Sequence, residues 1–345
     1  MPTSQEVIFT IKALHSSDLD IISNTFVKMK VFCILAVFAL AAAVSAFPNE
    51  AGREHGENGW YVPNADGSYT WLSTEESESL LAEHEEKEQS QTRLSLVPVN
   101  FYLYTSKNPS TAQQISETAK SILNSNFNAD NPTKVLIHGW LQSYTASMNK
   151  NIRDAWLSRG DYNIIVVDWA RARLLDYVSS VAAVEPTGKK VASMLDYLAQ
   201  YHGLSMAKVE VIGHSLGAHV AGFTGKIYNK PNKRLNSDDA TYVESIQTDG
   251  GQLGAFYPNG GKKQPGCGLD LTGACAHARS CVYYAEAVKE NNFPSMRCGD
   301  YQEAVKKDCG TSYSSVKMGA MTNAYLVAGD YYVPVRSTAP YGMGS

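Results

Sequence analysis

The chain has 345 residues, of which 44% are hydrophobic and 19% are charged, and its formal net charge is −4. This composition is that of an ordinary globular protein with enough apolar residues for a substantial core, and the length allows one large domain or two small ones. The small negative charge and the lack of a long Lys/Arg run give no reason to expect nucleic-acid binding.

The N-terminal part has the form of a secretory signal. Residues 29–46 comprise a short basic start, an apolar stretch and a small-residue end at Val44-Ser45-Ala46, which is the pattern of a cleaved signal peptide. The apolar run is too short to favour a stable transmembrane anchor. We therefore expect a secreted protein whose mature chain starts near Phe47. Residues 1–28 are mixed in charge, and we interpret them as an upstream extension ahead of a translation start at Met29.

Residues 47–94 form an acidic leader. They contain turn signals followed by a Glu-dominated run from Glu75 to Gln91. We interpret the leader as a solvated extension or a pro-segment in preference to an acidic binding site.

The body, residues 95–345, alternates strand and helix patterns. Continuous apolar runs at 134–138, 163–169 and 208–212 are typical of buried parallel strands, and residues 96–104 alternate as an edge strand does. Helical patterns cover residues 111–124, 146–159 and 185–201. This alternation predicts an α/β fold with a mostly parallel central sheet flanked by helices.

A nucleophile motif follows the strand at 208–212. Residues 213–217 read Gly-His-Ser-Leu-Gly and match Gly-x-Ser-x-Gly, in which the glycines allow the sharp strand-to-helix turn that exposes Ser215. The amide of Leu216 would then face a developing oxyanion. The turn His138-Gly139-Trp140, after an earlier strand, can supply a second amide from Trp140. The alternative is that His138 merely caps a loop at the strand end.

A serine nucleophile needs a base and an acid that follow it in the chain order usual for this motif. His277 is the preferred base, because it starts a helix two residues after Cys275, whereas His219 lies inside the helix after Ser215 and suits packing. Asp168 precedes Ser215, so we interpret it as structural.

Cysteine usage agrees with secretion. Cys33 leaves with the signal, and the other five cysteines lie between residues 267 and 309, where disulfides would hold loops together. Five is an odd number, so one thiol has no partner among them. No Cys or His pair has zinc-ligand spacing, and no metal or other cofactor is expected.

The sequence resembles the pancreatic lipase family, in particular its insect secreted members similar to phospholipase A1 and to yolk proteins. The segments that carry the resemblance are 135–140, 166–169, 213–222, 239–248, 256–261, 264–267 and 275–277. The resemblance implies an α/β-hydrolase fold with Ser215 as nucleophile, His277 as base, and the Trp140 and Leu216 amides as oxyanion hole. It also implies a Cys267–Cys275 disulfide that closes a lid loop. We further expect Cys298–Cys309, which leaves Cys281 as the odd thiol.

The chain departs from the family after the nucleophile helix. Family members carry there a strand that ends in Gly-Leu-Asp-Pro, whose Asp completes the triad, but here Lys226 is followed almost directly by the polar stretch 229–235. We interpret the acid-bearing strand as deleted. Asp238 and Asp239 precede the expected strand 242–247 and would lie at the wrong edge of the sheet. Asp249 follows that strand and is a weak candidate for a substitute acid.

The lid and the end of the chain bear on the substrate. Only residues 268–274 separate the lid cysteines, which resembles the phospholipase A1 branch, and the chain has no room for the family's C-terminal β-sandwich domain. Two hypotheses follow. The protein is a secreted serine ester hydrolase acting on lipid or phospholipid at an interface, or it is a catalytically impaired, lipid-binding relative of the yolk-protein kind.

Overall fold

The computed structural model describes residues 8–12, 52–54, 57–66, 68–93, 98–226, 239–240, 242–248, 264–268, 273–319, 323 and 327–344. For residues 8–12 and 88–93 it describes the backbone alone.

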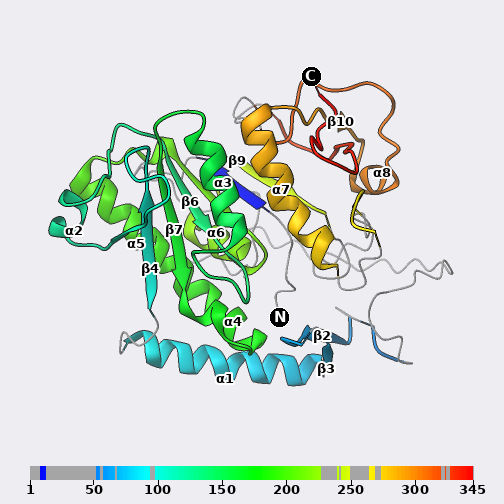
Figure 1. Cartoon of the computed structure of the whole chain (residues 1–345). Helices are drawn as coiled ribbons and strands as arrows, with labels where there is room; N and C mark the ends of the chain where they lie inside the picture. The colour runs from blue at the N-terminus through cyan, green and yellow to red at the C-terminus, as the bar shows by residue number, and fades with distance from the viewer. Residues whose placement is uncertain are drawn as a thin grey trace, which may run out of the picture.

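A seven-stranded sheet in the order β5-β4-β7-β6-β8-β1-β9 forms the centre of the molecule (Figure 1). Its strands are β1 (Ile8–Lys12), β4 (Val99–Tyr104), β5 (Gln113–Ile115), β6 (Thr133–Ile137), β7 (Asn163–Trp169), β8 (Val209–Gly213) and β9 (Tyr242–Ile246). Strand β6 pairs in parallel with β7 and β8, and only β4 and β1 run against the other strands. The predicted mostly parallel α/β sheet is confirmed.

Helices cover both faces of this sheet. They are α2 (Ala119–Leu123), α3 (Ser147–Leu157), α4 (Tyr177–Ala182), α5 (Val184–His202), α6 (Leu216–Gly225), α7 (Ala274–Glu290) and α8 (Tyr301–Lys306), with short 3-10 helices η1 (Ala170–Arg173) and η2 (Met206–Lys208). Helices α5 and α6 pack together over one face, and α3 and α7 pack together over the other. The strands divide their residues between the faces with period two: Val135 and Ile137 point to the first face and Leu136 to the second.

The sequence patterns place most of these elements. Helices α3 and α5 match the predicted helices at 146–159 and 185–201. The helix predicted at 111–124 is wrong in its first half, because Gln113–Ile115 forms β5 and pairs with β4. Helix α2 begins only after Thr118, whose side chain accepts a hydrogen bond from the amide of Ser121.

The leader forms secondary structure that packs against the body. Strands β2 (Gly59–Pro63) and β3 (Tyr69–Ser73) make a hairpin, and α1 (Thr74–Arg93) follows it and lies beside α4 (Figure 1). Leu81 of α1 is buried in the same apolar cluster as the first face of the sheet, whereas Glu75 and Glu76 are exposed. A pro-segment role for the leader stays a prediction.

Strand β1 is a feature that the sequence analysis did not predict. Its backbone lies between β8 and β9 and is antiparallel to both, with Phe9 opposite Gly213 on one side and Ser245 on the other. The slot between the strand that leads to the nucleophile motif and β9 is therefore filled by residues from the N-terminal extension.

The C-terminal region carries both expected disulfides, Cys267–Cys275 and Cys298–Cys309, and Cys281 is buried and unbridged. Burial raises the pKa of the Cys281 thiol to about 12, so this thiol stays protonated and unreactive at neutral pH. The region also contains the short pair β10 (Met296–Arg297) and β11 (Tyr331–Tyr332). Among the described residues, no helix has the length and apolar character needed to cross a membrane.

Candidate active site

Ser215 occupies the turn between β8 and α6. Its backbone has φ 56° and ψ −129°, a conformation that a residue with a side chain rarely adopts and that costs on the order of 1–3 kcal/mol. A Cβ atom on Gly213 or Gly217 would collide with backbone atoms of the turn or of the end of β6. The sequence therefore needs glycine at both positions, and the strand–turn–helix that the motif predicted is present.

The Gly139–Trp140 turn after β6 lies directly against Ser215. A Cβ built on Gly139 would stand 2.6 Å from the Cβ of Ser215. The amide of His214 donates to the carbonyl of Ile137 at 3.0 Å and ties the two turns together. Within the described residues, the amides of Trp140 and Leu216 donate no hydrogen bond to another protein group. Two backbone donors beside one serine are the arrangement that an oxyanion requires.

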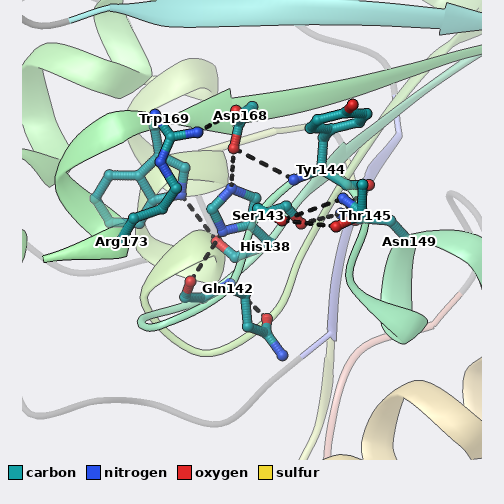
Figure 2. Close-up of polar contacts among 10 residues, drawn as sticks. His138, Gln142, Ser143, Tyr144, Thr145, Asn149, Asp168, Trp169 and Arg173 are labelled. Carbon is teal, nitrogen blue, oxygen red and sulfur yellow. Dashed lines mark hydrogen bonds and ion pairs between the residues drawn. The ribbon is translucent and has the colours of Figure 1, made fainter. Parts of the chain in front are cut away.

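The side chain of His138 contacts this turn and the end of β7. Its ring is fully buried, with Nε2 3.2 Å from Oδ1 of Asp168 and Nδ1 2.9 Å from the carbonyl oxygen of Gly139 (Figure 2). Through these two contacts the buried ring holds the oxyanion turn in place.

Asp168 is a structural acid, as the chain order predicted. Its Oδ1 also accepts from the amide of Tyr144 at 3.2 Å, and its Oδ2 accepts from Nη1 of Arg173 at 2.6 Å (Figure 2). Burial acts to raise the pKa of Asp168, but the bond from His138 and the charge of Arg173 outweigh it, so the pKa lies below the ordinary value. The carboxylate is fully used in joining the ends of β6 and β7.

His277 lies in the first turn of α7, next to the nucleophile turn. Its ring centroid is 4.4 Å from that of His214, the residue before Ser215, and the Cys267–Cys275 disulfide anchors the start of the helix. The structure thus places His277 against the residue that precedes Ser215. Within the described chain, however, the Ser215 hydroxyl makes no hydrogen bond, so the two are not directly bonded. His219 is fully buried inside α6.

Burial also sets the protonation of these histidines. It lowers the pKa of His214 and of His277 to about 4, although His277 keeps part of its surface exposed. For His277 the cause of the lowered pKa is burial of the ring, which disfavours the charged imidazolium. At neutral pH the imidazole is therefore uncharged and can accept a proton.

The candidate acids give no replacement among the described residues. Asp239 is buried and forms an ion pair with Lys226 at 3.2 Å, at the end of α6. Asp238 and Asp249 lie outside the described residues. Strand β1, which fills the slot between β8 and β9, reads Ile-Phe-Thr-Ile-Lys and contains no carboxylate.

A buried polar contact that sequence reasoning missed joins the nucleophile strand to the base helix. Glu210 of β8 accepts from the hydroxyl of Tyr284 on α7 at 2.7 Å and pairs with Lys134 of β6 at 2.5 Å. The Lys134 ammonium also lies 3.8 Å from the centroid of the Trp156 ring. A signal was present, because Lys134 and Glu210 are opposite charges in two apolar runs and face each other in register.

Comparison with known proteins identifies relatives over the leader and body. The model of the Lipase family matches residues 68–233 and 228–341. Pancreatic triacylglycerol lipase of Oryctolagus cuniculus is 31% identical over 264 residues, which cover 62% of this chain and 57% of the relative. Inactive pancreatic lipase-related protein 1 of Canis lupus familiaris is 31% identical over 267 residues, which cover 62% of this chain and 56% of the relative. Phospholipase A1 of Vespa tropica is 30% identical over 248 residues, which cover 60% of this chain and 81% of the relative. The chain thus spans little more than half the length of the mammalian relatives.

Proposed function

Because the chain belongs to the Lipase family and has its α/β-hydrolase fold, we propose that it is a secreted serine carboxylic-ester hydrolase acting on lipids, most like a phospholipase A1. The observation that carries the proposal is the strained turn at Ser215, with the Gly139–Trp140 turn packed against it and the Trp140 and Leu216 amides making no hydrogen bond to another described group. Strain of this kind persists where the surroundings enforce it, and it is common at catalytic turns.

The proposed chemistry uses four groups. Oγ of Ser215 attacks the ester carbonyl carbon while His277 accepts the hydroxyl proton, and the amides of Trp140 and Leu216 stabilise the oxyanion. Collapse of the intermediate breaks the bond to the alcohol, which receives the proton from His277. Water then attacks the acyl-enzyme through the same steps and releases a free fatty acid and Ser215. No cofactor takes part.

We expect loss of the acid-bearing strand, which is interpreted from the sequence, to limit the rate. In a complete triad the acid holds the tautomer of the base and stabilises its charged form, and removing it lowers turnover roughly 10⁴-fold.

Two observations favour a phospholipid substrate and secretion. The disulfide Cys267–Cys275 closes a loop with a sequence separation of 8, which supports a short lid that leaves the serine open to polar head groups. The match to the phospholipase A1 of Vespa tropica covers 81% of that relative. The two disulfides also agree with an extracellular location.

A second candidate function is lipid binding with little or no catalysis. The same missing acid favours it, and the relative from Canis lupus familiaris is itself named an inactive lipase-related protein. Retention of both Ser215 and His277 favours the hydrolase instead, since a binding protein needs neither.

The test is hydrolysis by the purified full chain of a phospholipid and of a dispersed short-chain ester, beside the Ser215→Ala variant. We expect slow fatty-acid release, roughly 10⁴-fold below a complete relative, that Ser215→Ala abolishes. If the unmodified chain releases fatty acid no faster than the Ser215→Ala variant, the hydrolase proposal is rejected and the lipid-binding function remains.

A further inference from the structure

One amide of the oxyanion turn is held by a side chain. The amide of Gly139 donates to Oε1 of Gln142 at 3.0 Å, and both residues lie in the turn that follows β6 (Figure 2). Gly139 is buried against Ser215, where a Cβ would stand 2.6 Å from the serine Cβ. Because a buried amide without an acceptor is costly, the Gln142 oxygen meets a requirement of this turn.

The loop after the turn is fastened at other points. The amide of Leu141 donates to the carbonyl of Ala172 at 2.6 Å, and the amide of Tyr144 donates to Oδ1 of Asp168 at 3.2 Å. Nδ2 of Asn149, in the first turn of α3, donates to the carbonyl of Tyr144 at 3.3 Å (Figure 2). These contacts give the loop a fixed course on which Gln142 is carried.

The backbone of Leu141 is strained. Its φ is 57°, in the left-handed region that residues with a branched side chain seldom occupy. This conformation turns the chain so that Gln142 folds back onto the amide of Gly139. Strain of this kind persists only where the surroundings enforce it, and here the hydrogen bonds of Leu141 and Gly139 do so.

The peptide that joins Gly139 to Trp140 carries one of the two proposed oxyanion donors. A peptide unit is planar and trans, so the Gly139 carbonyl and the Trp140 amide point in opposite directions. The carbonyl oxygen lies 2.9 Å from Nδ1 of His138, and the amide on the other side of Gly139 is held by Gln142. Glycine restricts its own rotation little, so these two contacts fix the direction of the Trp140 amide.

We propose that Gln142 is a positioning residue for the oxyanion donor: by accepting from the Gly139 amide, it keeps the Trp140 amide aimed at the oxygen of a tetrahedral intermediate. The inference rests on the proposed function, because an oxyanion forms only if an ester is attacked. A donor stabilises developing charge most when it is already oriented. That charge develops in the transition state, so Gln142 should act on turnover more than on substrate binding.

Gln142→Met tests the proposal, because it removes the acceptor and keeps a side chain of similar size. Loss of an oxyanion donor costs roughly 10²- to 10³-fold in turnover, and a donor that is present but loosely held should cost less, roughly tenfold. We expect kcat for a dispersed short-chain ester to fall by that factor while KM stays unchanged. An unchanged kcat, or a change in KM alone, would overturn the proposal.

Gln113→Met is the matched control. Gln113 is also half-buried, and its Oε1 accepts from the amide of Asn126 at 2.8 Å. It lies on β5, which β4, β7 and β6 separate from β8. Both Met variants should lose a similar, small amount of stability in urea unfolding, but only Gln142→Met should lose turnover. An equal loss of kcat in both would show a general effect of stability and reject positioning.

Hydrogen exchange of the Gly139 amide tests the contact itself. The amide should exchange faster in Gln142→Met than in the unmodified chain, whereas Gln142→Glu, which keeps an acceptor oxygen, should retain the protection. Equal exchange in the unmodified chain and Gln142→Met, or loss of protection in Gln142→Glu, would show that the side-chain oxygen does not hold the turn.

Butylboronic acid separates this inference from the proposed function, since it adds to a serine hydroxyl and gives a tetrahedral adduct without turnover. Its Kd should rise roughly tenfold in Gln142→Met and stay unchanged in Gln113→Met. If the unmodified chain cleaves no ester but its boronic acid affinity depends on Gln142, the hydrolase proposal fails and the positioning role stands. If the ester is cleaved but Gln142→Met matches the unmodified chain in kcat and in boronic acid affinity, the positioning role alone fails.

Discussion

On one side of β8 the sheet continues through β6 and β7, whereas on the other side it continues through β1 and β9. Every residue of β6, β7 and β8 is buried, but in β9 only Ile246 is. The first side carries the oxyanion turn, its bracing by His138 and Asp168, and a continuous core. The second side has a strand from the N-terminal extension where an acid-bearing strand was expected. We call the first side the nucleophile half and the second side the acid half, and we predict from the sequence that the acid half lacks its acid.

The contacts on the first side explain why Ser215 and His277 keep their positions although we interpret the acid-bearing strand as deleted. The turn at Ser215 depends on Gly139, Gly213 and Gly217, all on the complete side. His277 is positioned by α7, whose Tyr284 bonds to Glu210 of β8. We therefore expect deletion of the acid-bearing strand after Lys226 to leave both residues in place while removing support for the imidazolium.

The largest expected effect comes from rebuilding the missing side. Inserting a strand that ends in Gly-Leu-Asp-Pro between Lys226 and Asn229 should raise ester turnover by roughly 10⁴-fold, because an acid would then orient His277 and stabilise its charged form. The measurement is fatty-acid release. The same insertion with Asn in place of its Asp is the control, and an equal gain from that control would show that the acid was not what the chain lacked.

A second test asks whether the stability of the sheet depends on β1, which lies between β8 and β9. Thr10→Pro removes a ladder donor from a strand paired on both edges and should lower the free energy of unfolding by about 3 kcal/mol. Thr10→Ala keeps the backbone donor and should change it far less. Urea unfolding of both variants checks the expectation. Equal stability of Thr10→Pro and the unmodified chain would show that the sheet does not rely on β1.

Signal cleavage adds a consequence to that test. A mature chain that starts near Phe47 lacks residues 8–12, so the edges of β8 and β9 would lose their β1 partner. N-terminal sequencing of secreted material should begin at Phe47, and that shortened chain should be less stable than the full chain by an amount similar to the Thr10→Pro loss. Secreted protein that still begins at or before Met29 would contradict the predicted cleavage.

The buried histidines predict how stability varies with pH. His214 and His277 have pKa values lowered from 6.5 to about 4, so between these values the unfolded chain binds more protons than the folded chain. Their contribution is present above pH 6.5 and is lost as pH falls toward 4, on the order of 3 kcal/mol for each ring. Urea unfolding at several pH values measures the slope, which His214→Gln should reduce. A flat profile down to pH 4.5 would contradict the burial of both rings.

A smaller effect tests the link between β8, which leads to Ser215, and α7, which carries His277. Tyr284→Phe removes the hydroxyl that donates to Glu210 and should lower the free energy of unfolding by roughly 1.5–3 kcal/mol, because the acceptor is a buried carboxylate. Tyr283→Phe is the control on the same helix, where the hydroxyl has only a 3.3 Å bond to Gln264. Similar losses in both variants would remove the special role of the Glu210 contact.

Sequence reasoning predicted the elements that local residues encode and missed those that depend on pairing with a distant strand. The turn at Ser215 is encoded locally by two glycines, and the buried strands by continuous apolar runs, so both were found. Residues 113–115 were misassigned because pairing with β4, a distant segment, overrides the local helical pattern. Strand β1 was missed for the same reason, since only a vacancy elsewhere in the sheet gives that segment a partner.

The most direct measurement of the central claim is the rate at which a fluorophosphonate labels Ser215, followed by peptide mass spectrometry on the full chain. Labelling needs the serine, the oxyanion amides and the base, and it accelerates when an acid supports the base. The account predicts labelling confined to Ser215, at a rate about 10³- to 10⁴-fold below that of a complete pancreatic triacylglycerol lipase and unchanged by Asp249→Asn. Labelling as fast as in the complete lipase, and lost in Asp249→Asn, would show that the acid half is present after all.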